Sequence, residues 1–116
     1  MIIKIENHTS LKQALDTLCE FLLLEKVEKD RVFDSKLVAC ELLGNVFKHS
    51  QGGATLRGEV NAGFIELRIL SDFPFLPTEI ELPALYSEHG RGLFLIQNVS
   101  EGIEPINGGV LVRIKI

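Results

Sequence analysis

The chain has 116 residues, of which 46% are apolar and 24% are charged, so we expect one globular domain spanning residues 1–116. The net charge is −4, and the 12 basic residues are scattered without a run rich in lysine or arginine. These values exclude disordered, collagen-like and coiled-coil chains, and they argue against nucleic acid or an acidic membrane surface as a partner.

The sequence predicts an alternation of strands and helices along the whole chain. Apolar residues at three- and four-residue spacing predict helices, and alternation with period two predicts strands. Ser10 and Gln13 form a capping box before the first helix, and Asp34 can cap the second. Charged residues 25–34 and proline-containing residues 71–89 predict loops. The predicted elements, in chain order, are a strand at 1–5, helices at 11–26 and 34–49, strands at 54–60 and 64–70, a helix at 92–99, and strands at 102–106 and 110–116.

This order of elements predicts an α/β (α+β) two-layer sandwich. The segment Asn61-Ala62-Gly63 separates two alternating runs and indicates a hairpin. Pro105 places the short strand at 102–106 at a sheet edge, because proline cannot donate to a central ladder. We therefore expect a mostly antiparallel, mixed sheet that carries three helices on one face.

Two cysteines, Cys19 and Cys40, fall within apolar helical patterns and form no C-x-x-C motif. We expect two buried, reduced thiols, since a metal site would need more ligands at closer spacing. The N-terminus lacks the regions of a signal peptide, and no apolar run is long enough to cross a bilayer. These features predict a cytoplasmic protein.

The second predicted helix carries a narrow polar line on an otherwise apolar surface. Glu41, Asn45 and His49 are spaced four residues apart and fall within about an 80° arc of the helix. An exposed polar edge would explain the line without any function. Alternatively, Glu41 is a general base beside an amide oxygen that can ligate a hard cation. We predict that the line faces a cleft, because a carboxylate enclosed by apolar residues needs a partner or water.

A glycine pair precedes the third predicted helix. Backbone N–H groups of Gly90-Arg91-Gly92 at a helix N-terminus can approach a phosphate, and Arg91 can add a charged contact. A flexible turn that caps the helix is the alternative.

The polar line and the glycine pair are more specific together than either motif is alone. The segment E-L-L-G-N-V-F-K-H at residues 41–49 resembles the N-box of the GHKL (histidine-kinase-like) ATPase superfamily, and G-R-G-L-F-L-I at residues 90–96 resembles its second glycine box.

The residues of both motifs resemble those of one branch of this superfamily, the anti-sigma-factor serine/threonine kinases. The resemblance covers nearly the whole chain. It implies a Bergerat-type fold that binds ATP and Mg²⁺. It further implies that Glu41 is the general base and that Asn45 holds Mg²⁺. The remaining nucleotide-binding positions that the resemblance implies are His49 and Leu93, Asp72 for the adenine, and Gly90, Arg91 and Gly92 for the phosphates.

The chain departs from the family on the nucleotide side. The first glycine box of the family reads D-x-G, whereas this chain has Asp72-Phe73-Pro74, so that either Pro74 replaces the glycine or a deletion removes it. Proline supplies neither the torsions nor the N–H of that glycine. The lid segment at 74–89 carries acids and no lysine or arginine, and Val110 stands where threonine is usual.

Three functions therefore stay open. The first is a serine kinase that binds a sigma factor and phosphorylates an antagonist protein in bacterial partner switching. The second is a degenerate module, a pseudo-kinase, that sequesters a protein partner without ATP turnover. A fragment of a larger sensor is disfavoured, because the chain starts at Met1 and we expect its sheet to close at Ile116. A homodimer is possible. We expect the lid to be mobile, to be pinned by its own apolar residues, or to block the adenine site with Phe73 or Phe75.

Overall fold

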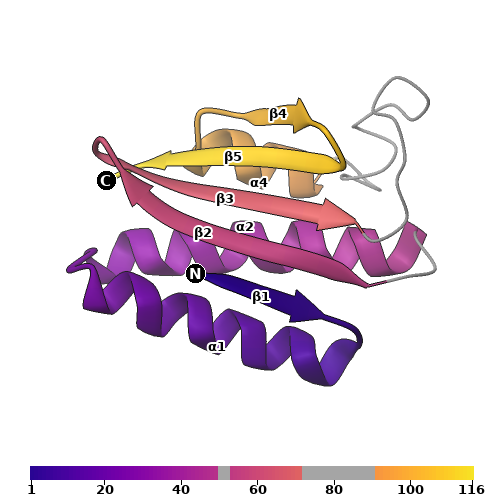
Figure 1. Ribbon diagram of the computed structural model, residues 1–116. Helices are drawn as coiled ribbons and strands as arrows, with labels where there is room; N and C mark the ends of the chain where they lie inside the picture. The colour runs from indigo at the N-terminus through magenta and orange to yellow at the C-terminus, as the bar shows by residue number, and fades with distance from the viewer. Residues whose placement is uncertain (50–52, 72–90) are drawn as a thin grey trace.

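The computed structural model describes residues 1–49, 53–71 and 91–116. Its elements follow the order predicted from the sequence (Figure 1). They are β1 (Ile2–Ile5), α1 (His8–Leu24), α2 (Lys29–His49), β2 (Ala54–Asn61), β3 (Phe64–Ser71), α4 (Arg91–Val99), β4 (Ile103–Ile106) and β5 (Gly109–Lys115).

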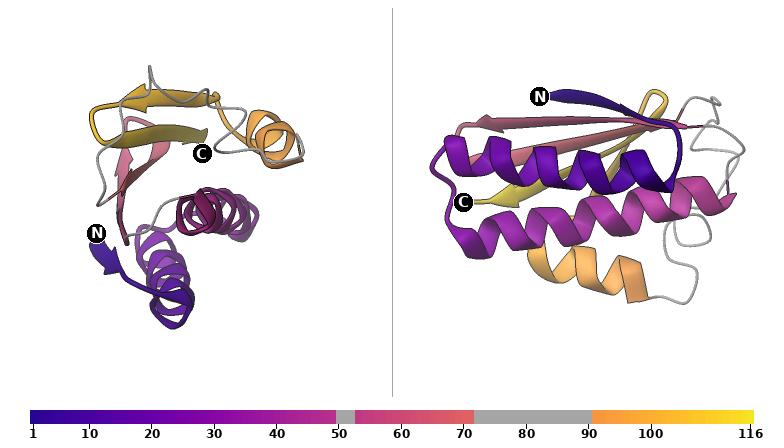
Figure 2. Two further views of the ribbon diagram at one scale, coloured as in Figure 1. Left: turned by 90° about the vertical axis from the view of Figure 1, so that its right-hand side faces the viewer. Right: turned by 90° about the horizontal axis from the view of Figure 1, so that it is seen from below.

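The five described strands form one sheet in the order β1-β2-β3-β5-β4. Each of the four pairings is antiparallel, so the described sheet is more regular than the mixed sheet that we expected. Figure 2 shows α1, α2 and α4 on one face of this sheet, with α2 between the other two. The α+β class with two layers is thus confirmed, and β4 with Pro105 lies at a sheet edge as predicted.

The core lies between the sheet and the helices. Alternate residues of the strands and one side of each helix supply fully buried aliphatic side chains. The largest of these are Ile5, Leu18, Leu22, Leu42, Leu43, Leu56, Ile65, Leu67, Ile69, Ile96 and Ile114. None of the helices in the described part of the chain is long and apolar enough to cross a membrane.

The predicted hairpin is confirmed, and its turn explains the register of the central strands. Ala62 and Gly63 both have positive φ, 52° and 83°, which is the backbone of a two-residue turn suited to strand twist. Asn61 therefore pairs with Phe64, and the ladder runs without a break to Ala54 and Ser71. The register places successive residues of β2 and β3 alternately on the core face and on the opposite face.

Helix α1 begins earlier than predicted. Asn7, and not Ser10, is the N-cap, and the Asn7 side chain accepts a hydrogen bond of 2.9 Å from the backbone N–H of Ser10. The Ser10 hydroxyl lies 3.1 Å from the Asn7 N–H, which donates to it, so the two residues satisfy each other's backbone groups. Ser10 is a capping residue as predicted, but it occupies the third helical position.

We expect Asn7→Ala to destabilise the protein by about 1 kcal/mol, because the side-chain acceptor of the cap is lost. Thermal unfolding followed by circular dichroism measures the change. Thr9→Ala, at an exposed position in the same turn, is the control and should leave the midpoint nearly unchanged. An equal effect of both variants would contradict the capping role of Asn7.

Helix α2 begins at Lys29, within the charged segment that the sequence predicts as a loop. Asp34 is therefore not the N-cap but lies in the second turn, where its carboxylate pairs with Arg31 at 3.1 Å. The reason is tertiary burial, since Val27 and Val32 are almost completely buried despite their charged neighbours. Packing of these two valines stabilises a turn of helix that local composition does not favour.

Candidate functional site

Helix α2 carries the two described residues of the predicted site on adjacent turns. Asn45 is one of the few buried polar residues of the described chain, with 8% of its surface exposed. Glu41, one turn earlier, is partly exposed. The pair thus lies at the border between the core and the surface, where water can reach the carboxylate beside a buried amide.

The neighbours of α2 show which side of the helix these residues occupy. Burial raises the pKa of the Cys19 thiol on α1, and the positive charge of Lys36 on α2 lowers it, so Lys36 is on the side of α2 that faces α1. At 100° per residue, Asn45 is about 180° and Glu41 about 140° around the helix from Lys36. Since α4 flanks α2 opposite α1 (Figure 2), Glu41 and Asn45 are on the side of α4.

This placement meets a necessary condition of the predicted cleft. Helix α4 starts at Arg91, within the second glycine motif, and it contacts α2. Had Asn45 faced α1, the two motifs would have been on opposite sides of α2. That the polar line borders a cleft stays a prediction.

The other predicted site residues are outside what the structure describes. Asp72 and Gly90 fall in the undescribed ranges, and so does the lid with Phe73, Pro74 and Phe75. His49 belongs to the last turn of α2, and Arg91, Gly92 and Leu93 belong to the first turn of α4, but their side chains are likewise outside the described part.

The donor set on α2 fits one kind of metal ion. Among the described residues, no three His, Cys, Asp or Glu side chains gather as a metal-binding group. Mg²⁺ needs no such group, because it keeps several waters and takes one or two protein oxygens together with phosphate oxygens. The amide oxygen of Asn45 is an oxygen donor of this type. That Asn45 holds a nucleotide-bound Mg²⁺ stays a prediction.

The cysteines correct one prediction. Both are free, but only Cys19 is partly buried, whereas Cys40 is exposed on the surface of α2. Apolar neighbours along the sequence suggested burial, yet Cys40 lies on the side of α2 that no described element covers, with the exposed Phe33 two turns earlier.

We expect Cys40 to react with a thiol reagent at least tenfold faster than Cys19 near neutral pH. Burial raises the pKa of Cys19 and so lowers its thiolate fraction, and the thiolate is the reactive form. Raising the pH should therefore narrow the difference between the two rates. Alkylation followed by mass spectrometry of the intact protein measures both rates. The variants Cys19→Ser and Cys40→Ser show which rate belongs to which cysteine. Faster labelling of Cys19 would contradict this order.

The structure also shows a charged cluster that the predictions did not include. It lies on the face of the sheet that α1, α2 and α4 leave open, where Arg113 on β5 donates to Glu66 on β3 and to Glu104 on β4, both at 3.0 Å. The hydrogen bond to Glu66 is the main cause that raises the pKa of Arg113, and Glu104 adds to it. Alternating charges in residues 57–59 and 66–68 of the predicted hairpin were the available signal for this cluster.

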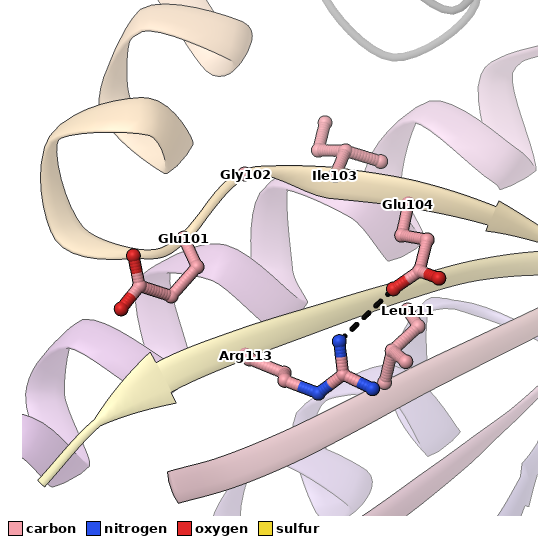
Figure 3. Close-up of a pocket in the computed structure, with 6 residues that line it drawn as sticks. All are labelled: Glu101, Gly102, Ile103, Glu104, Leu111 and Arg113. Carbon is pink, nitrogen blue, oxygen red and sulfur yellow. Dashed lines mark hydrogen bonds and ion pairs between the residues drawn. The ribbon is translucent and has the colours of Figure 1, made fainter.

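A shallow depression borders the cluster at the start of β4 (Figure 3). Its volume is about 70 Å³, and it is lined by Glu101, Gly102, Ile103, Glu104, Leu111 and Arg113. Pockets for small organic ligands measure about 300–1,000 Å³, so this depression is too small for a nucleotide. In Figure 3 the carboxylate of Glu104 and the guanidinium of Arg113 point toward each other across it.

Comparison with known proteins found neither a family model nor a curated protein that matches the chain.

Proposed function

We propose that this protein is an ATP-binding regulator of the GHKL type, which phosphorylates a serine of an antagonist protein in bacterial partner switching. In this proposal Asn45 holds Mg²⁺ on the nucleotide, and Glu41 accepts the proton of the attacking hydroxyl. Bound Mg²⁺ supplies neutralisation of the charge that develops on the phosphates. A sigma factor is the proposed second protein partner.

The observation that carries the proposal is the position of Asn45. A buried amide on an apolar helix, one turn from a partly exposed carboxylate and on the side of α4, fits the N-box motif. The two-layer arrangement, with α2 between α1 and α4, is compatible with the Bergerat-type fold that the proposal requires. The proposed phosphate contacts at Gly90, Arg91 and Gly92, the adenine contact at Asp72 and the nucleotide contact at Leu93 rest on sequence resemblance alone.

One observation favours a second function, a pseudo-kinase that sequesters its partner. Pro74 stands near the position where the family has the glycine of its first glycine box. A proline there removes an N–H and restricts φ, so nucleotide affinity on the adenine side would fall. In this alternative, Glu41 and Asn45 persist without turnover, and a sigma factor or similar protein is bound stoichiometrically.

Isothermal titration calorimetry with ATP, in Mg²⁺ and in EDTA, separates the two functions. The kinase proposal expects weak binding that depends strongly on Mg²⁺, since the phosphate side must supply most of the affinity. Absence of any ATP binding in Mg²⁺ would contradict the kinase proposal and leave the sequestering module. Tight binding that persists in EDTA would contradict the expectation that the phosphate side, through Mg²⁺, supplies most of the affinity.

A further inference from the structure

The face of the sheet opposite the helices has a charge opposite to that of the whole chain. The strand register and the alternation of side chains place Lys4, Arg57, Arg68, Arg113 and Lys115 on this face, together with Glu59, Glu66 and Glu104. Five basic and three acidic residues leave a net charge of +2, whereas the chain as a whole carries −4. Among the described elements, no helix covers this face (Figure 2).

Arg57 and Arg68 stand side by side at the centre of the open face. They are directly opposite each other in the β2–β3 ladder, an arrangement of like charges that is unfavourable by itself. Glu59 and Glu66 are likewise opposite each other, two residues away along the strands. The two strands thus form a row of two cations next to a row of two anions.

The guanidinium groups of Arg57 and Arg68 have few hydrogen-bond acceptors among the described residues. Each can donate five hydrogen bonds, yet the described residues give the pair one, a long bond of 3.4 Å from Arg57 to Glu59. Among the described residues, Arg68 makes ion pairs only at 3.9 Å, to Glu59 and Glu66. The Nε atom of Arg57 and the Nη1 atom of Arg68 are buried and have no hydrogen-bond partner in the described part of the structure. Donors in this state are rare in native proteins, so the described acids do not saturate the hydrogen-bonding capacity of the arginine pair.

By contrast, the neighbouring acids are already engaged. Glu66 is almost fully buried and accepts a hydrogen bond of 3.0 Å from Arg113, which also donates to Glu104. Arg113 therefore holds two of the three acids of the face. Glu59 pairs with both central arginines, and Glu66 adds only its ion pair of 3.9 Å to Arg68. On the other side of the arginine pair, the next residues on this face are Thr55 and Leu70, which bring no charge. The described residues therefore bring no acid to that side of the arginine pair.

We propose that the open face of the sheet binds an acidic segment of a partner protein, whose carboxylates pair with Arg57 and Arg68. A carboxylate accepts two parallel hydrogen bonds from a guanidinium, and the exposed parts of Arg57 and Arg68, whose side chains are 41% and 26% exposed, can donate them. Ile2 lies opposite Arg57 on the edge strand β1 and is 67% exposed, so it offers an apolar contact beside the charged one. The site is separate from Glu41 and Asn45, which lie on the other side of the sheet, and it does not require nucleotide.

Two other occupants fit the face less well. A nucleic acid presents a continuous row of phosphates, which the three acids of the face would repel. A second copy stacked through the same face would bring another net charge of +2 against the first. Both occupants are tested by the same experiment.

Fluorescence anisotropy with a short labelled peptide of alternating glutamate and valine tests the proposal. The wild-type protein should bind this peptide, with affinity that falls as salt is added. Arg57→Gln with Arg68→Gln should weaken binding by about tenfold or more, as loss of charge-assisted hydrogen bonds predicts. Lys12→Gln with Lys29→Gln removes the same charge from exposed helix positions and is the matched control, which should bind as the wild type does.

Several results would overturn the proposal. They are no binding of the acidic peptide, equal loss in both double variants, or tighter binding of a single-stranded oligonucleotide or a lysine–valine peptide. A dimer in sedimentation that the arginine variant disrupts, without peptide binding, would do the same and would assign the face to a second copy. If the glutamine variant fails to fold, Arg57→Lys with Arg68→Lys keeps the charge but loses the paired donors, and it should still bind more weakly than the wild type.

Discussion

Gly109→Ala is expected to remove a large part of the stability of the protein. Gly109 is buried at the start of β5, where it pairs with Leu70 of β3. A Cβ atom at this position would overlap the backbone carbonyl oxygen of Ile69 and lie 2.9 Å from the Leu70 Cα atom. Because backbone atoms cannot rotate away, the two strands must separate, which we expect to cost about 4 kcal/mol or more. A domain of this kind is stable by only about 5–15 kcal/mol.

Gly44→Ala is the matched control for this prediction. A Cβ atom on Gly44, in the middle of α2, would meet nothing within 4 Å. The same substitution should therefore raise the free energy of unfolding by about 0.5–1 kcal/mol, because alanine favours the helix. Urea unfolding of both variants measures the difference. A Gly109→Ala protein with wild-type stability would contradict the close approach of β3 and β5.

The second large effect concerns α2. If the kinase proposal is correct, Asn45→Ala should abolish measurable binding of ATP in Mg²⁺, because the protein oxygen proposed to hold the ion is lost. Glu41→Gln should leave that binding intact and slow the formation of ADP by about 10²–10⁴-fold, the usual contribution of a general base. Calorimetry measures the first change, and a radiolabelled assay of ADP formation measures the second.

Two controls make this prediction specific. Glu20→Gln removes an acid from the exposed surface of α1 and should change neither binding nor ADP formation. Since Asn45 is buried, thermal unfolding must show that Asn45→Ala is folded at the temperature of the assay. Loss of binding in Glu41→Gln, or full ADP formation by it, would contradict the division of roles between the two residues.

The fold was predictable from the sequence wherever local chemistry determines it. Asn61-Ala62-Gly63 specifies a hairpin, and the apolar spacing of residues 92–99 specifies α4, so both appear as expected. The predicted start of α2 was wrong, because Val27 and Val32 are buried by contacts that the composition of residues 25–34 does not reveal. Charge favours a loop there, and tertiary packing overrides it.

The candidate site was only partly accessible for a similar reason. Periodicity placed Glu41 and Asn45 on one line of α2, but their relation to α4 depends on how helices pack, which no spacing contains. The open face shows the same limit. The alternation in β3 predicts that Glu66 faces solvent, yet Glu66 is almost fully buried. It is hydrogen-bonded to Arg113, which is far away in the sequence but lies on the neighbouring strand. Such pairings become visible only when β5 is placed next to β3.

The antiparallel ladder has a consequence for how the protein folds. The β2–β3 and β4–β5 pairings join neighbours in sequence, so each hairpin can form within microseconds. The β1–β2 and β3–β5 pairings close much longer loops, from Ile5 to Ala54 and from Leu70 to Gly109. These two closures should limit the folding rate, since their entropy is lost before the contacts form. The cost of a loop grows only logarithmically, by about 0.6 kcal/mol for each doubling. Insertions between Ser71 and Arg91 should therefore slow folding slightly while leaving the rest of the sheet thermodynamically almost unaffected.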